Sequence, residues 1–231
     1  MRLPDHHALA SARMNIWRSA AALCLLFTLA GCNDAKPTTD TPAKPDLALA
    51  ATGLTSGDYR YIITLPGQKI EGVYDHDQPA WSKRSTIDGT VYELVLVGTD
   101  QYTKTGDGSW QHLDLTSEPY AEMSARMGLT FDNPDRTGAT ALLAAARDVT
   151  LTGTTLTGQI DTSAITTALG ELMTVTTALA DGNRLPFTAT LDAQGRLTGL
   201  TMQMASGPWT MTITGYDPLP APTIPATFTA G

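Results

Sequence analysis

Cysteine is nearly absent from this chain. Its 231 residues include only two, Cys24 and Cys32, both close to the N-terminus. Everything after Cys32 therefore lacks disulfides, a thiolate nucleophile and a cysteine metal site. A domain of about 200 residues can bury enough apolar surface to be stable without such cross-links. We expect the main part of the chain to fold through its hydrophobic core alone.

The chain also lacks an apolar run of the roughly 20 residues that a membrane-spanning helix needs. The run at 20–30 (AAALCLLFTLA) follows Arg18, with Arg2 and Arg13 further upstream. A short apolar run behind positive charges is typical of a secretory signal peptide. Met14 is a second possible start, which would give an N-terminal region of normal length. Both starts predict a leader that is removed.

The apolar run ends in Leu29-Ala30-Gly31-Cys32, and polar residues follow at once. This ending resembles the bacterial lipobox. The resemblance implies that Cys32 receives a diacylglyceryl group and becomes the first residue after cleavage. The alternative is an ordinary signal peptide with an incidental cysteine. We expect residues 1–31 to be a lipoprotein signal peptide, and the lipid on Cys32 to hold the chain at the extracytoplasmic face of the cell membrane.

Positive charge is scarce, with 15 Lys and Arg against 23 Asp and Glu. The leader contains three arginines and one aspartate, so its removal leaves 12 basic and 22 acidic residues, a net charge of −10. Nucleic-acid binding needs clustered basic residues, so nucleic acid is not an expected partner. Nucleophile-elbow, zincin, phosphate-loop and dinucleotide motifs are missing. We expect no enzyme, no cofactor and no metal site.

The composition divides the remaining chain into three parts. Residues 32–46 are rich in Pro, Thr, Lys and Asp without apolar periodicity, which indicates a disordered tether. Residues 47–216 carry the patterns of a folded domain. Residues 217–231 contain four prolines and are expected to form an extended tail.

Within the domain, short segments rich in β-branched and aromatic residues alternate with turn residues. Asp88-Gly89 is a strong hairpin signal between two of these segments. Strands are predicted at 59–65, 70–74, 81–87, 91–97, 101–104, 110–113, 148–151, 156–161, 185–191, 196–204 and 209–214.

Three segments interrupt this pattern. A short helix is predicted at 47–51, a second from a Thr137 cap to Arg147, and a longer one from a Ser163 cap to Ala180. Runs of antiparallel strands with helical insertions predict an α+β domain. Its curved antiparallel sheet would have two or three helices covering the concave face.

Four segments resemble a known family. They are the strand at 59–65 followed by Gly-x-Tyr-Asp at 72–75; the block 95–114, ending in Trp-Gln-His-Leu-Asp; the stretch 186–197, with Asp-Ala-Gln-Gly-Arg-Leu; and the closing strand followed by Thr-Ile-Pro at 223–225. They are similar to actinobacterial cell-envelope lipoproteins of the LppX and LprG type, whose fold resembles the LolA lipoprotein carrier. The resemblance implies a half-barrel with helices over its concave face and acyl chains of envelope glycolipids between them.

This resemblance leads to a hypothesis for function. The chain would bind or carry an apolar ligand, such as an acylated envelope lipid, between sheet and helices. Flexible methionines suit a wall that adapts to varied chains. The alternative is that the same residues fill an ordinary core in a non-catalytic interaction or scaffolding module. The candidate wall residues are Leu142, Leu143, Ile165, Leu169, Leu172, Leu179, Met202 and Met204.

Two histidines lie outside the leader. Asp75-His76-Asp77 raises the possibility of a metal or acid–base site, but successive strand residues point to opposite faces, so a solvated turn is expected. His112 and Asp114 share one face of a predicted strand, where a cross-strand polar contact is expected.

Overall fold

The computed structural model describes residues 45–118, 120–126, 129, 131–165, 171, 184–216 and 218–230. The chain divides into two units, Met1–Thr41 and Pro42–Gly231, and every described residue belongs to the second. The expected signal peptide, Cys32 and most of the expected tether lie outside the described residues.

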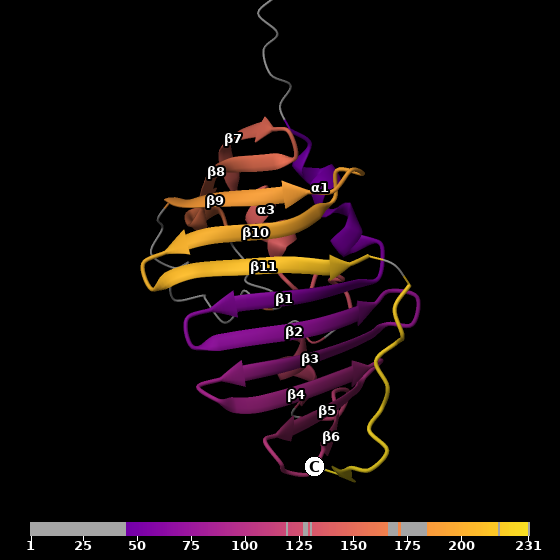
Figure 1. Cartoon of the computed structure of the whole chain (residues 1–231). Coiled ribbons are helices and arrows are strands. Elements are labelled where there is room, and N and C mark those ends of the chain that lie inside the picture. The colour runs from indigo at the N-terminus through magenta and orange to yellow at the C-terminus, as the bar shows by residue number, and fades with distance from the viewer. Residues whose placement is uncertain are drawn as a thin grey trace, which may run out of the picture. The chain divides into compact units, whose positions relative to one another are not determined.

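The described part is built on one twelve-stranded sheet with the order β12-β6-β5-β4-β3-β2-β1-β11-β10-β9-β8-β7 (Figure 1). Each strand expected from the sequence is present, with ends shifted by at most two residues. The strands are β1 Tyr59–Leu65, β2 Gln68–Asp75, β3 Ala80–Ile87, β4 Thr90–Val97, β5 Asp100–Thr105, β6 Gln111–Asp114, β7 Ala146–Thr152, β8 Thr155–Asp161, β9 Arg184–Leu191, β10 Leu197–Met204, β11 Gly207–Gly215 and β12 Thr229–Ala230.

Tight turns join most neighbouring strands, as the turn residues predicted. Between β3 and β4, Asp88 and Gly89 have φ values of 48° and 83°. Positive φ at both central residues matches the twist of a two-residue hairpin, and Asp-Gly tolerates it well. The resulting sheet is the expected curved, mostly antiparallel half-barrel.

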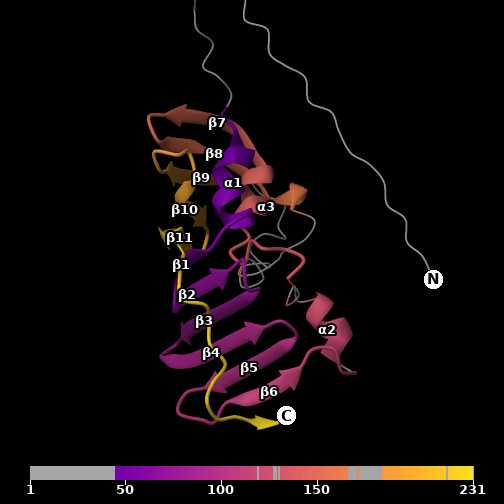
Figure 2. The same cartoon turned by 90° about the vertical axis from the view of Figure 1, so that its right-hand side faces the viewer.

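Three α-helices lie on the side toward which the sheet curves: α1 Leu47–Thr55, α2 Tyr120–Arg126 and α3 Ala139–Ala144 (Figure 2). Asp46 caps α1, because its carboxylate accepts hydrogen bonds from the backbone N–H groups of Ala48 and Leu49. Helices α1 and α3 stand against the face formed by β7–β11, whereas α2 lies near the β6 end of the sheet.

The helix predicted from Thr137 to Arg147 is shorter than expected. It runs from Ala139 to Ala144, with Gly138 at its N-cap position, and Ala146 already belongs to β7. Its start is fixed by the buried Asp135, whose carboxylate accepts hydrogen bonds from the backbone N–H groups of Thr137, Gly138 and Thr140. These bonds hold the first turn in a position that the apolar spacing did not reveal.

The helix predicted from Ser163 to Ala180 lies largely outside the described residues. Its first residues form a short 3₁₀ turn, Thr162–Ala164, for which Asp161 provides the cap. Helix α2 was not predicted at all.

The C-terminal tail adds the one parallel pair to the described sheet. After β11 it runs along the ends of the strands toward the far edge, where Thr229 pairs with Gln111 and Ala230 with His112 (Figures 1 and 2). The Thr229 N–H donates to the carbonyl of Trp110 at 2.9 Å. The predicted extended tail therefore ends as an edge strand of the sheet.

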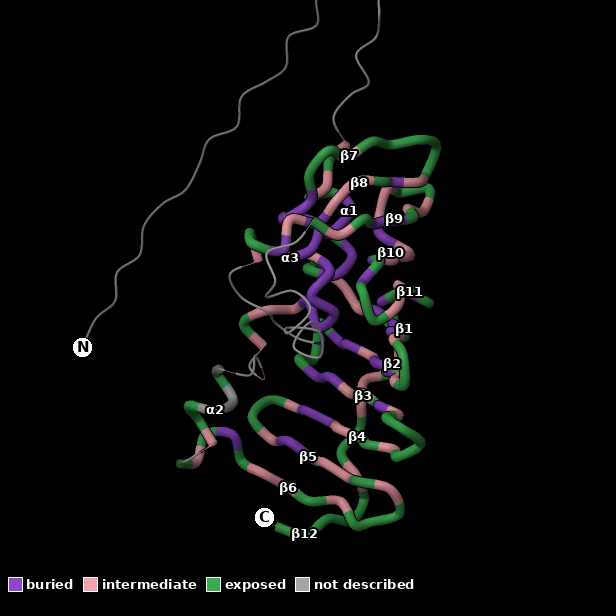
Figure 3. Tube along the Cα trace, turned by 90° about the vertical axis from the view of Figure 1, so that its left-hand side faces the viewer, coloured by how far each residue is buried: buried purple, intermediate pink, exposed green. Residues whose placement is uncertain are grey.

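The two faces of the sheet differ in burial. We call the face toward α1 and α3 the inner face. Along β1 its residues Tyr59, Tyr61 and Ile63 are fully buried, whereas Arg60 and Thr64 on the outer face are exposed. Figure 3 shows buried segments in α1, α3 and the middle strands of the sheet, with exposed residues mainly at the strand ends and turns.

Candidate functional site

The inner face contains a group of aromatic and charged side chains at the middle of the sheet. Tyr61 lies directly opposite Gly72 in the β1–β2 register. A Cβ atom on Gly72 would lie 2.2 Å from Cζ of Tyr61, so glycine is required for the ring to lie across β2. The Tyr61 hydroxyl then accepts a hydrogen bond from Nε1 of Trp81 at 3.0 Å. Gly72, the glycine of the Gly-x-Tyr-Asp segment, therefore leaves the space that the Tyr61 ring occupies.

The Tyr61 hydroxyl also donates to Oε1 of Glu171 at 3.1 Å. Nζ of Lys83 lies 3.3 Å from the other carboxylate oxygen of Glu171. The Glu171 side chain is 1% exposed, whereas that of Lys83 is 26% exposed. Burial raises the pKa of Tyr61 well above its ordinary value, and the nearby Glu171 charge raises it further.

Arg136 forms the second charged part of this group and is also buried. Its guanidinium lies 5.1 Å from the centre of the Trp81 ring and 4.7 Å from that of Phe131. Burial lowers the pKa of Arg136 below its ordinary value. The backbone N–H of Arg136 donates to the Tyr59 hydroxyl, which donates in turn to the carbonyl of Pro134. These contacts fix the segment before α3 on the inner face.

We call this group the inner polar cluster. Its members come from β1, β2, β3, the segment before α3 and the described residue 171. They are Tyr59, Tyr61, Tyr74, Trp81, Lys83, Arg136 and Glu171.

Beyond the cluster, the inner face of β4–β6 is only partly covered and carries a few apolar side chains among the polar residues Thr90, Gln101, Thr103, Thr105 and Gln111. Leu94 lies opposite Lys83 in register, and Leu96 opposite Trp81. Leu96 is buried, but Leu94 and Leu113 keep intermediate exposure. Tyr92, on the same face, is 43% exposed. This half of the inner face therefore retains accessible apolar surface next to a cationic side chain.

The candidate wall residues lie elsewhere. Leu142, Leu143 and Met202 are at most 1% exposed, Met204 is 9% exposed, and Ile165 packs against the same buried cluster from its edge. They belong to the core between α1, α3 and β8–β11. Leu169, Leu172 and Leu179 lie outside the described residues. Whether these positions line a ligand space stays a prediction.

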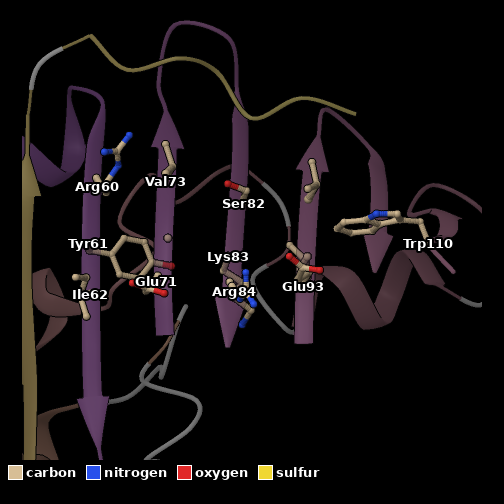
Figure 4. A pocket seen from close by; sticks show the side chains of 13 residues that line it. Arg60, Tyr61, Ile62, Glu71, Val73, Ser82, Lys83, Arg84, Glu93 and Trp110 are labelled. Atoms are coloured by element: carbon tan, nitrogen blue, oxygen red, sulfur yellow. The ribbon is translucent and has the colours of Figure 1, made fainter. Parts of the chain in front are cut away.

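The outer face carries a shallow groove of about 430 Å³ across β1–β4 (Figure 4). Two cross-strand rows border it. One contains Arg60, Val73, Ser82 and Val95, and the other contains Ile62, Glu71, Arg84 and Glu93. The side chains of the intervening row point to the inner face, so its backbone forms the floor. Lys69 pairs with Glu71 and Lys104 with Glu93, at 2.8 and 3.0 Å. The groove is a charged, water-facing surface.

His112 lies on the outer face, where the C-terminal tail contacts the sheet. Its Nε2 is 2.6 Å from Oδ1 of Asp100, and its ring stacks on Tyr102 at 4.9 Å. The Phe228 ring lies 5.0 Å from Tyr102. The expected cross-strand polar contact of His112 is confirmed, and its partner is Asp100 on β5. The carboxylate of Asp114 instead accepts hydrogen bonds from the N–H and hydroxyl of Thr116, which lower its pKa.

His76 lies in the turn after β2, where its backbone N–H donates to the Asp58 carboxylate. Within the described residues, no group of three or more His, Cys, Asp or Glu side chains is arranged to hold a metal ion. None of the described helices is long and apolar enough to cross a membrane.

The described part is thus an α+β half-barrel with a curved sheet and helices over its inner face, the architecture of LolA-like proteins. The sequence matches no family model and no curated protein. Among solved structures, LprF from Mycobacterium bovis is 15% identical, aligns over 77% of this chain and 94% of its own, and gives a TM-score of 0.53. The Mycobacterium tuberculosis lipoprotein LppX is 19% identical over 76% of this chain and 97% of its own, with a TM-score of 0.44. The likeness to LprF shows the fold, which is the curved half-barrel that the sequence resemblance implied.

Sequence reasoning missed the inner polar cluster. Glu171 fell within a predicted helix and Lys83 within a predicted strand, and neither stood out. One signal was available. Gly72 and Tyr74 are two residues apart in a predicted strand, so they lie on the same face, and a glycine beside an aromatic residue there predicts space for another side chain. The charged partners could not be found this way, because they are 88 residues apart.

Proposed function

We propose that this chain is a lipid-anchored envelope protein that binds the acyl part of an envelope lipid between its sheet and helices. The anchor is a lipid on Cys32, which places the domain on the extracytoplasmic side of the cell membrane. The protein acts by holding its ligand and performs no catalysis.

The observation that carries the proposal is a set of apolar side chains, Tyr92, Leu94 and Leu113, that stay at least partly exposed on the inner face of β4–β6 in a half-barrel with the fold of LprF. Leu94 and Leu113 are partly exposed there, and the buried Leu96 and Trp81 lie beside Leu94 on the same face. Solvent-accessible apolar side chains on the curved face of a sheet are typical of a ligand-binding site. An acyl chain on this surface removes it from water at roughly 25 cal/mol per Å².

The candidate wall residues extend the same face past β1. Met202 and Met204 lie on the inner side of β10, beyond the inner polar cluster as seen from Leu94. Methionine side chains can repack around an inserted chain more readily than branched ones. We propose that a long acyl chain reaches these residues when it is bound.

The competing function is an interaction or scaffolding module with a solid core. The near-complete burial of Leu142, Leu143 and Met202 favours it, because well-packed residues leave no room for a ligand. In that case the accessible apolar residues of β4–β6 would contact a protein partner.

The test uses residues 42–231, which form a compact unit by themselves. Native mass spectrometry without detergent is expected to show lipid adducts, and a fluorescent fatty acid is expected to bind saturably. Leu94→Trp fills the inner face and should weaken binding at least about tenfold, or about 1.4 kcal/mol.

The matched control is Val91→Trp, on the outer face of the same strand, which should bind like the unmodified protein. An apo mass together with no saturable binding would refute the lipid-binding proposal. Loss of fatty-acid labelling in the full-length Cys32→Ser chain reports separately on the anchor.

A further inference from the structure

Lys83 is the one cation among the inner-face residues of β1–β6, all of which the structure describes. The other basic residues of these strands, such as Arg84 and Lys104, lie on the outer face. The chain as a whole carries a net charge of −8, so its overall field repels anions. Attraction of an anionic ligand to the inner face must come from a local positive charge.

The surroundings of Lys83 hold its ammonium group without enclosing it. Nζ lies 3.3 Å from Oε2 of Glu171 and 5.2 Å from the centre of the Trp81 ring. An ammonium group has three N–H donors, and one salt bridge uses one of them. With 26% of the side chain exposed, room remains for a second oxygen partner.

Stability gives little reason for a charge pair at this position. Burying the Glu171 carboxylate costs hydration that its attraction to the partly exposed Lys83 hardly recovers, and apolar replacements of buried charge pairs are often neutral or stabilising. Here Glu171 is also held by the Tyr61 hydroxyl at 3.1 Å, which limits how far its carboxylate can turn toward solvent. The Glu171 carboxylate fixes the position of the Lys83 ammonium group, and this ammonium group provides the positive charge that can contact a ligand.

Lys83 also lies at the border between the inner polar cluster and the partly exposed apolar side chains of β4–β6. Across β4 its register partner is Leu94, and the next partner on β5 is Thr103. Both are partly exposed on the inner face. A ligand that extends from Lys83 over β4 would meet a charge at one end and the Leu94 side chain next to it, with Leu113 further along the same face.

We propose that Lys83 is a specificity residue that selects lipids with an anionic group, carboxylate or phosphate, next to the acyl chain. Glu171 and Tyr61 are positioning residues for it. This proposal rests on the proposed function and names the class of ligand. The anion binds Lys83 while the acyl chain covers Leu94 and Leu113.

The test compares ligands with one acyl chain and different headgroups on residues 42–231. Palmitate carries a carboxylate, palmitoyl lysophosphatidate a phosphate, and monopalmitoylglycerol no charge. The unmodified protein should bind at least one of the anionic lipids about tenfold or more tightly than the neutral one. The tighter of the two identifies carboxylate or phosphate, and inorganic phosphate alone should not compete.

Lys83→Gln should remove this preference while binding of monopalmitoylglycerol changes less than about threefold. The matched control is Lys104→Gln, since Lys104 is 27% exposed and paired with Glu93, but on the outer face. It should keep the preference. Because Lys83→Gln leaves Glu171 without this partner, Lys83→Arg and the double variant Lys83→Gln/Glu171→Gln keep the test valid if the single variant unfolds. Arginine should restore the preference and the double variant should lack it.

Equal binding of charged and neutral lipids by the unmodified protein would overturn the proposal, and so would equal losses for all lipids in Lys83→Gln. Loss of preference in Lys104→Gln would overturn it too, since overall charge would then be the cause. If no lipid binds at all, the proposed function itself fails. If lipids bind without discrimination, only the role of Lys83 fails.

Discussion

The two halves of the sheet share one architecture but differ in what covers their inner face. Strands β7–β11 are packed under α1 and α3, with Trp209, Met211 and Leu200 fully or almost fully buried. Strands β2–β6 combine buried aromatic and charged groups with partly exposed leucines. The first half has the packing of a stable core, and the second has accessible apolar and charged groups that a ligand can contact. If the proposed function holds, stability and ligand binding are provided by different strands of one continuous sheet.

The largest expected effect concerns the core of the β7–β11 half. Leu142→Ala and Met202→Ala should each lower the free energy of unfolding by about 2–5 kcal/mol, because each removes a buried side chain from a packed region. Urea denaturation of residues 42–231 measures this. Leu113→Ala, at a partly exposed site in the other half, should cost clearly less.

The same pair of variants also tests the ligand-wall hypothesis. A cost well below about 2 kcal/mol for Leu142→Ala in lipid-free protein would mean that Leu142 borders an empty space rather than a filled core.

An intermediate effect is expected at Gly72. Gly72→Ala places a methyl group against the Tyr61 ring, moves the hydroxyl away from Trp81 and Glu171, and should cost about 1–3 kcal/mol. Near-UV circular dichroism should report the altered aromatic packing.

The control is Gly215→Ala, in β11, where an added Cβ meets no atom within 4 Å. Its stability should change little. In a double-mutant cycle, Gly72→Ala should destabilise the Tyr61→Ala variant much less than it destabilises the unmodified protein. If the two losses of stability were additive, the contact with Tyr61 would not be the cause.

The smallest effect near neutral pH is expected from the tyrosines of the inner polar cluster. Burial raises the pKa of Tyr59 and Tyr61 well above the value of about 10 that they have when unfolded. Their contribution to stability is complete below pH 10 and is lost as the pH rises toward the folded-state pKa. Stability should therefore fall above pH 10, and less steeply in Tyr61→Phe.

Absorbance at 295 nm follows tyrosinate formation and should show a fraction that appears only on unfolding. If all tyrosines titrated together near pH 10 in the folded protein, the buried environment described for Tyr59 and Tyr61 would be wrong.

The sequence by itself determined the strands, the turns and the resemblance to a LolA-like half-barrel. Alternation of apolar and polar residues and the Asp88-Gly89 turn are local signals, and strands that pair with their chain neighbours follow from them. Local signals also predicted the leader and Cys32, although the structure does not describe them. Local signals were less reliable for helices: α3 begins later than its pattern indicated, where Asp135 fixes its start, and it ends earlier, because the chain enters β7 at Ala146.

Only the tertiary structure decided which inner-face residues meet. Lys83 and Glu171 are 88 residues apart, and Tyr59 reaches Pro134 over 75 residues. Such pairs depend on where the segment before α3 and residue 171 lie against the sheet. The spacing of apolar residues along the chain does not specify this position. The tail likewise carried no strand signal at Thr229–Ala230, and it pairs with β6 because that edge offers free backbone hydrogen-bonding groups. Periodicity specifies which face a residue occupies, and three-dimensional packing specifies its partner.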